Sequence, residues 1–64
     1  MAQAPKFGYF VDHAGDWRWH LKAPNGLIIA DSGQGYTTRQ DCITSAKLVQ
    51  AYAPSAEIVP DRAP

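Results

Sequence analysis

The sequence predicts one α+β domain in which three antiparallel strands are followed by a helix, packed on one face of their sheet, and by a short last strand. Two segments alternate apolar and polar residues with the period of two that is typical of strands. Each is followed by a tripeptide with glycine in third place, as in short hairpin loops. A later segment has the helical period and ends before a proline.

The first two strands are expected at residues 6–12 and 17–23, where aromatic residues favour extended structure. Alternation places the large apolar side chains on one face and the basic side chains of the second strand on the other. The apolar face carries Phe7, Tyr9, Val11, Trp17, Trp19, Leu21 and Ala23, and the opposite face carries Gly8, Phe10, Asp12, Arg18, His20 and Lys22.

The first loop sets the pairing of these two strands. His13-Ala14-Gly15 fits a three-residue hairpin loop, in which a type I turn is followed by a left-handed residue. Such a loop predicts that Tyr9 lies opposite Trp19. The other predicted pairs are Phe7 with Leu21, Val11 with Trp17 and Asp12 with Asp16.

The second loop allows two registers. As a three-residue loop, Pro24-Asn25-Gly26 places Leu21 opposite Ile29 and keeps the large apolar residues on one face. A two-residue loop at the Asn-Gly pair would instead place Asp31 opposite His20 and split the apolar set. We favour the first register, because a slip of one residue turns every side chain to the other face.

The third strand is expected at residues 27–32 and the helix at 39–52. Thr37 and Thr38 are both candidate N-caps, since Gln or Asp follows three residues after each. The residue before Pro54 ends the helix, and residues 56–59 are long enough for a short strand. The apolar stripe of the helix comprises Cys42, Ile43, Ala46, Leu48, Val49, Tyr52 and Ala53.

Length and composition exclude several classes of protein. The 64 residues leave room for one domain, expected at residues 6–59 between a disordered N-terminus at 1–5 and a flexible tail at 60–64. Six basic and six acidic residues argue against a tail that binds polyanions, and 45% hydrophobic residues argue against disorder. No apolar run has the length of a membrane span or a signal-peptide core, so no membrane association is expected.

A domain this small usually needs a disulfide, a metal or a partner for stability. The lone Cys42 has no second cysteine to pair with, and it fits a reducing, cytoplasmic setting. His13 and His20 have no further ligands at the spacing of a zinc site, so neither a metal nor another cofactor is expected. Ile58 and Val59 form an apolar pair beyond the helix, and exchange of this arm between two copies would bury it.

Two runs, residues 15–26 with their Trp17-Arg18-Trp19 core and residues 29–36, resemble the YegP-like family of small bacterial domains, also called DUF1508 or UPF0339. The resemblance covers residues 7–54. It implies β-β-β-α-β units that join into one sheet and exchange their C-terminal strands, and hence a homodimer with residues 56–59 as the exchanged strand. It implies no established biochemical activity. The chain departs from the family pattern at Gly8, His20 and Gln34, where charged residues are common.

The basic face of the second strand is a candidate ligand or nucleic-acid site. Phe10, Arg18, His20 and Lys22 project from it, and an aromatic ring among basic groups on an open sheet is typical of platforms for single strands. We favour a structural explanation of the same face, either a solvated surface on which Phe10 stacks under Arg18 or a dimer interface. The candidate dimer contacts are Ile28, Ala30, Ile58 and Val59.

No arrangement of residues indicates an enzyme. Cys42 lies on the apolar helix stripe, where a thiol is usually inert, and no local signal pairs it with His20. Asp12, His13 and Asp16 cluster at the first loop, where Asp favours turns by bonding backbone N–H groups. We therefore expect a cytoplasmic, non-enzymatic homodimer that acts as an interaction module, with a protein partner or, as the alternative, with nucleic acid.

Overall fold

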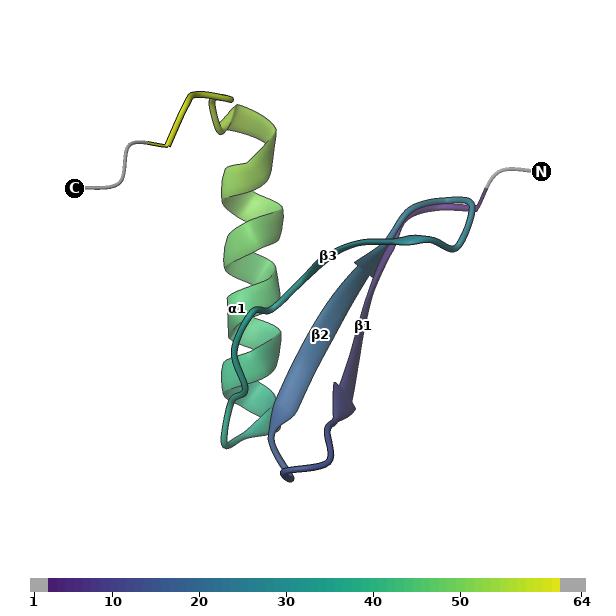
Figure 1. Ribbon diagram of the computed structural model, residues 1–64, viewed down its shortest axis with the longest axis vertical. Coiled ribbons are helices and arrows are strands. Elements are labelled where there is room, and N and C mark those ends of the chain that lie inside the picture. Colours follow the sequence, from purple (N-terminus) through teal and green to yellow (C-terminus); the bar gives the residue numbers. More distant parts are fainter. Residues whose placement is uncertain (1–2, 62–64) are drawn as a thin grey trace.

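The computed structural model describes residues 3–61, so the outermost parts of both expected tails, at 1–2 and 62–64, lie outside the described residues. Its elements in chain order are β1 (Lys6–Val11), β2 (Trp17–Lys22), β3 (Ile28–Asp31), α1 (Arg39–Tyr52) and one 3₁₀ turn, η1 (Ala53–Ser55). The strands form one antiparallel sheet in the order β1-β2-β3, and α1 packs on β2 and β1 (Figure 1). The α+β class is confirmed.

The first hairpin has the predicted register. Tyr9 lies opposite Trp19 and Phe7 opposite Leu21. Gly15 has a φ of 86°, the left-handed conformation that a three-residue loop requires at its last position. The large apolar side chains of β1 and β2 therefore share the face on which α1 lies.

The second hairpin begins in the predicted register and then leaves it. The backbone N–H of Ala23 donates to the carbonyl of Leu27 at 2.8 Å, as the three-residue loop requires. A β-bulge then shifts the pairing by one residue, so that Leu21 lies opposite Ala30. The predicted pair of Leu21 with Ile29 was therefore wrong.

This bulge changes which residues of β3 share a face. Residues directly opposite one another in an antiparallel pair point to the same side. Ala30 consequently joins Leu21 on the apolar side, and not the polar side on which it was expected as a dimer contact. Ile29 still lines the same apolar groove as Leu21, because the bulge accommodates one extra residue in β3. Asp31 lies opposite His20, which is the pairing of the rival register.

The helix α1 has the predicted bounds, and Thr38 is its N-cap. The Thr38 hydroxyl accepts a hydrogen bond from the backbone N–H of Asp41 at 3.1 Å, which decides between the two candidate caps. The Asp41 carboxylate in the first turn also interacts favourably with the helix dipole. After Tyr52 the chain makes the turn η1, which contains Pro54.

Two contacts hold α1 and the segment before it against the sheet. Trp17 and Tyr36 exchange backbone hydrogen bonds of 2.7 and 2.8 Å, which form an isolated bridge next to β2. The Trp19 indole N–H donates to Ser45 Oγ at 2.9 Å, and the Tyr36 hydroxyl bonds the same oxygen at 2.9 Å. This network fixes the rotation of α1 on the sheet, and no pattern in the sequence indicated it.

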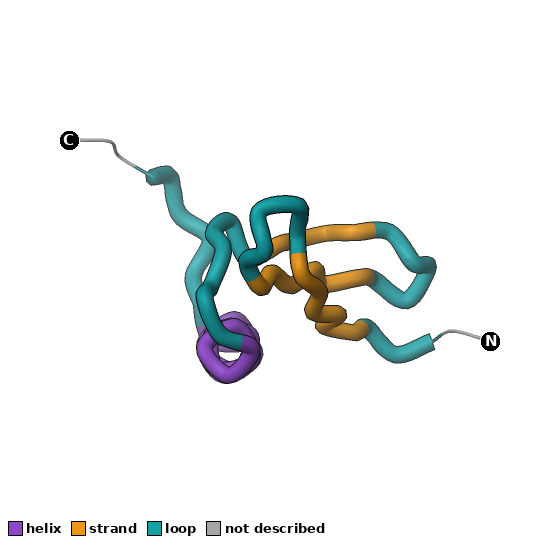
Figure 2. Tube along the Cα trace, turned by 90° about the horizontal axis from the view of Figure 1, so that it is seen from below, coloured by secondary structure: helices purple, strands orange, loops and turns teal. Residues whose placement is uncertain are grey.

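Residues 56–59, predicted as a strand, form none in this single chain. The segment leaves η1 and extends away from both the helix and the sheet (Figures 1 and 2). The exposed fraction of Ile58 is 102%, so this side chain has no packing partner within the described residues. A strand needs a neighbouring edge to bond, and the exchange with a second copy stays a prediction.

The core of the single chain is very small. Among residues 3–61, the buried apolar side chains are those of Trp19 and Cys42. The radius of gyration is 13.3 Å, whereas a compact chain of this length has about 11 Å. The accessible surface is 5412 Å², whereas a compact monomer of this mass exposes about 4,000 Å². The chain therefore leaves apolar surface open that a compact domain would bury.

Candidate functional site

The polar face of the sheet carries the predicted ligand residues. Phe10 of β1 lies directly opposite Arg18 of β2, and His20 and Lys22 follow along β2. The Phe10 ring packs against the His20 ring at a centroid distance of 4.6 Å, and both side chains are half-buried. The aromatic contact of Phe10 on this face is thus with His20.

Arg18 is bound to a carboxylate. Its Nε donates to Oδ2 of Asp12, and this hydrogen bond raises the pKa of Arg18 and lowers the pKa of Asp12 from its ordinary value. The other oxygen of Asp12 accepts the backbone N–H groups of Ala14 and Asp16 at 2.9 and 3.0 Å. The first loop therefore holds the carboxylate in place for Arg18.

The bulge in the second hairpin adds another negative charge to this face. Asp31 lies opposite His20, and its charge also favours the protonated form of Arg18. Asp31 is fixed in turn by a hydrogen bond of 2.9 Å from the backbone N–H of Gly33. The basic strand face is consequently less positive than its sequence suggested.

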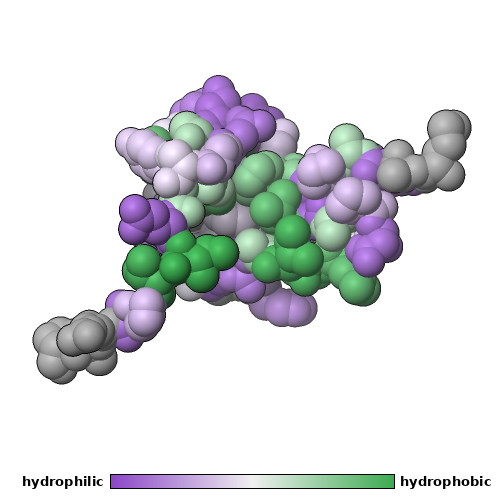
Figure 3. Space-filling model, turned by 90° about the horizontal axis from the view of Figure 1, so that it is seen from above, coloured by the Kyte–Doolittle hydropathy of each residue, from purple (hydrophilic) through white to green (hydrophobic). Residues whose placement is uncertain are grey.

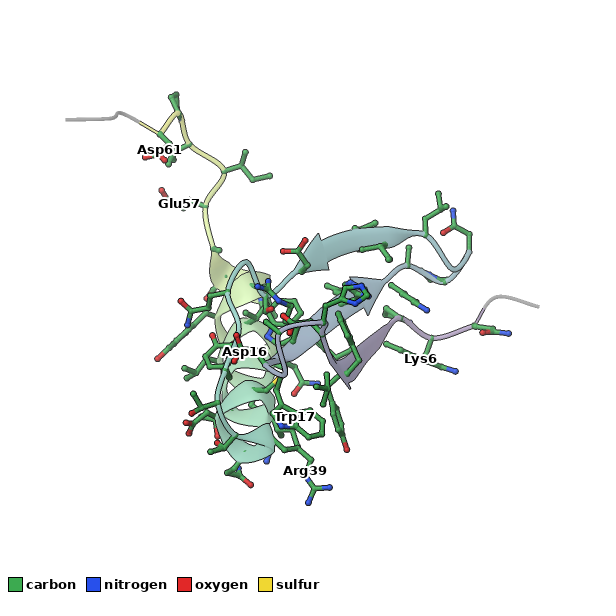
Figure 4. The ribbon with its side chains drawn as sticks, turned by 60° about the horizontal axis from the view of Figure 1, so that its bottom comes forward. Lys6, Asp16, Trp17, Arg39, Glu57 and Asp61 are labelled. Carbon is green, nitrogen blue, oxygen red and sulfur yellow. The ribbon has the colours of Figure 1, made fainter. Side chains whose placement is uncertain are left out.

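Two lysines at the open end of the first hairpin differ from Arg18. Lys6 lies directly opposite Lys22, and neither makes an ion pair within residues 3–61. Together with Ala23 and Gly26 they border a hollow of about 260 Å³. In Figure 4, Lys6 projects from the start of β1. Lys6 was absent from the predicted site, although the predicted register already places it opposite Lys22.

The other face of the sheet forms an open apolar groove with α1. The groove has a volume of about 500 Å³, and its walls come from all three strands and from the last turns of the helix. A second hollow of about 220 Å³ continues it along the helix, and Phe7 and Gln50 line both. The groove residues are Pro5, Phe7, Leu21, Ile29, Val49, Gln50, Ala53 and Pro54.

The predicted dimer contacts are exposed, and they lie in two separate places. Ile28 and Ala30 belong to β3, whereas Ile58 and Val59 belong to the segment beyond η1. Ile28 is 54% and Val59 62% exposed. Figure 3 shows hydrophobic residues over the strands and on the segment that leads to the C-terminal end. A single chain does not bring the two groups together.

The thiol of Cys42 lies inside the fold. Cys42 is fully buried, and burial raises the pKa of its thiol, so the reactive thiolate is disfavoured. Residues 3–61 contain no group of three or more His, Cys, Asp or Glu side chains that could hold a metal ion. No helix in this part of the chain has the length and apolarity needed to cross a membrane.

The chain is a small α+β domain that exposes more large apolar side chains than it buries. A family model described as "Domain of unknown function (DUF1508)" matches residues 12–59, and the chain belongs to this family. The resemblance inferred from the sequence is thereby confirmed. The family description carries no activity.

Relatives of similar length carry the name UPF0339 protein. One from Methanosarcina acetivorans is 43% identical over 54 residues, which cover 84% of this chain and 91% of the relative. One from Neisseria meningitidis serogroup B is 42% identical over 45 residues, which cover 70% and 79%. A protein from Haloferax volcanii, solved by NMR in solution, has a TM-score of 0.83 and 38% identity over 95% of this chain and 100% of that one. Since the relatives include archaeal proteins, the description of the family as bacterial was too narrow.

Proposed function

We propose that this protein is a non-enzymatic, cytoplasmic homodimer that acts as an interaction module, and that its two copies exchange their C-terminal segments. The incomplete core of the single chain is the observation that supports this proposal. Nine large apolar side chains are exposed, against the two buried ones: Tyr9, Val11, Leu27, Ile28, Ile29, Leu48, Tyr52, Ile58 and Val59.

The amount of open surface suits a dimer. The single chain exposes 5412 Å², which is about 1,400 Å² more than a compact monomer of its mass. A stable protein interface covers about 800 Å² on each partner. A second copy could therefore cover the excess, including part of the apolar groove between the sheet and α1.

The C-terminal segment and the sheet edges complement each other. β1 and β3 are the two edges of the sheet, and their outer backbone groups have no strand partner within residues 3–61. An extended segment that adds to such an edge satisfies backbone hydrogen bonds and places alternate side chains on the two faces. Ile58, which is fully exposed among the described residues, would then pack on the apolar face of the other copy.

Sedimentation equilibrium tests the homodimer. At micromolar concentration we expect twice the 7.0 kDa mass of the chain. Ile58→Asp should lower the mass towards that of one chain, because a charge at this position would oppose burial against the second copy, whereas the side chain is fully exposed within residues 3–61. Thr44→Asp, which adds the same charge at an exposed position of α1, is the control and should stay dimeric. A folded, stable 7.0 kDa species of the unaltered protein would refute the proposal.

A partner molecule would then meet the polar faces of the two sheets, since the second copy covers apolar surface. The observations favour a protein partner over nucleic acid on this face. Arg18 is neutralised by Asp12, and Asp31 adds negative charge beside His20. Lys6 and Lys22 make no ion pair within residues 3–61. A platform for single strands also needs exposed rings, and Phe10 is instead half-buried against His20.

A further inference from the structure

Lys6 and Lys22 form an unusual pair at the open end of the first hairpin. They are directly opposed residues of β1 and β2, and both are exposed. Like charges directly opposite one another destabilise a pair of strands. Within residues 3–61 neither lysine makes an ion pair that would offset this repulsion. The pair therefore favours an anion that comes from outside the described part of the chain.

The C-terminal segment carries suitable anions. Glu57 and Asp61 are exposed and make no ion pair within residues 3–61. Figure 4 shows both carboxylates beyond the C-terminal end of the helix, far from Lys6 at the start of β1. As the chain is folded here, its own carboxylates do not reach its own lysines. The carboxylates of a second copy, in contrast, can approach these lysines.

The alternation of charged and apolar residues along the C-terminal segment matches the two faces of β1. In an extended chain Glu57, Val59 and Asp61 point to one face and Ile58 points to the other. When the segment lies beside β1 with Ile58 on the apolar face, both carboxylates fall on the face of Lys6 and Lys22. Neighbouring strands lie about 4.8 Å apart, so Lys6 on β1 adjoins the added segment. Lys22 on β2 lies two strand spacings away, about 10 Å, which a lysine and a glutamate side chain span together.

The opposite edge of the sheet fits less well. Its strand, β3, carries Asp31 on the polar face, opposite His20, and this carboxylate would repel Glu57 and Asp61. Pro60 has no N–H to donate, which suits an outermost strand. Charge therefore favours β1 over β3, whereas the missing N–H of Pro60 suits an outermost strand at either edge.

We propose that Lys6 and Lys22 bind the carboxylates of Glu57 and Asp61 from a second copy, whose C-terminal segment adds to the free edge of β1. This inference rests on the proposed homodimer and goes beyond it, because it names the edge and the charges that select it. A symmetric dimer contains the contact twice, so its effect on association is doubled.

Charge reversal tests the contact. Sedimentation equilibrium at low salt should give a dimer dissociation constant about tenfold higher for Lys6→Glu than for the unaltered protein, because a weak surface attraction becomes a repulsion in two places. The difference should shrink in 0.5 M NaCl, since salt screens exposed charges. Arg39→Glu changes the net charge equally at the start of α1 and should leave the dissociation constant within about twofold.

Restored complementarity makes the test specific. Lys6→Glu combined with Glu57→Lys, or with Asp61→Lys, should return the dissociation constant to within about threefold of the unaltered value. The carboxylate that gives the stronger rescue lies nearer to Lys6. A dimer that responds no more to Lys6→Glu than to Arg39→Glu would overturn the assignment and leave the homodimer standing. A monomeric unaltered protein would overturn both.

A free-anion site is the competing explanation for the lysine pair. It predicts that inorganic phosphate shifts the NMR signals of Lys6 and Lys22 in the dimer, and that the dissociation constant does not respond to reversal. That combination would also overturn the assignment. Under our proposal the carboxylates occupy the pair, and phosphate at millimolar concentration leaves its signals in place.

Discussion

Gly35 lies directly before the Trp17–Tyr36 bridge, where the chain passes very close to the first loop. A Cβ atom at this position would lie 2.6 Å from Cβ and 2.8 Å from Oδ2 of Asp16. Neither distance is tolerable, so Gly35→Ala must push the segment away from β2. The two bridge hydrogen bonds, of 2.7 and 2.8 Å, would be strained or lost.

The expected cost follows from these contacts. Two weakened backbone hydrogen bonds contribute about 1 kcal/mol each, and overpacking adds about 1 kcal/mol or more. We therefore expect Gly35→Ala to lower the free energy of unfolding by about 2–3 kcal/mol. Urea unfolding, followed by tryptophan fluorescence at one fixed protein concentration, measures this quantity.

Gly8→Ala is the matched control for this experiment. A Cβ at Gly8 meets no atom within 4 Å, so the change should be within about 0.5 kcal/mol. Asp16→Gly removes the Cβ that clashes, and in the double variant the cost of Gly35→Ala should largely disappear. If Gly35→Ala unfolds at the same urea concentration as Gly8→Ala, the close approach has no energetic consequence and the reasoning is wrong.

Four further experiments test other parts of the structure. Ser45→Ala leaves the indole N–H of Trp19 and the hydroxyl of Tyr36 without their shared partner, and urea unfolding should show a loss of about 1–3 kcal/mol. Asp12→Asn should destabilise the protein less at pH 2 than at neutral pH, because the folded-state pKa of Asp12 is lowered and its contribution is lost as the pH falls through that pKa. A destabilisation that is equal at both pH values would contradict this assignment. Cys42 should react with a thiol reagent only at the rate of opening of the structure, and fast labelling of the native protein would show that it is not buried. Single-stranded oligonucleotides should not change the tryptophan fluorescence at low salt, whereas a change that weakens with salt would favour the nucleic-acid alternative.

Local signals in the sequence were sufficient for the first hairpin and the helix. A glycine in third place fixed the loop, and Tyr9 then had to lie opposite Trp19, as found. Pro54 and two candidate caps bounded α1 at its observed ends. These elements depend on residues that are close in sequence, so patterns of period and capping are enough to place them.

The second hairpin depends on more distant contacts. Its loop has the predicted form, but the bulge that follows is not marked by a glycine or a proline. At its start β3 is held by the three-residue loop. Beyond its end, the backbone N–H of Ser32 donates to the carbonyl of Trp19 at 3.0 Å. One extra residue lets β3 meet both constraints. Each of the two candidate registers is correct over one part of β3. The period of two in the sequence does not show where one register gives way to the other.

The bulge also altered the electrostatics of the candidate site. The sequence placed Phe10 and three basic residues on one face, and the structure confirms that they share it. It did not place Asp31 there, because Asp31 reaches the face only through the shift in register. The pairing of Arg18 with Asp12 was equally hidden, since it depends on how the first loop turns the carboxylate. A strand that reads as basic in sequence thus carries much less free positive charge in the fold.

The C-terminal segment shows how a pattern can predict a strand that one chain does not form. Apolar residues at 58 and 59 beyond a helix-ending proline indicate an extended segment, yet Ile58 is fully exposed within residues 3–61. Keeping such a side chain in water forgoes about 2 kcal/mol of burial in each copy. The groove between α1 and the sheet is a second apolar surface that one chain leaves open. The proposed homodimer accounts for both features, because a second copy would cover the open groove and the exposed Ile58.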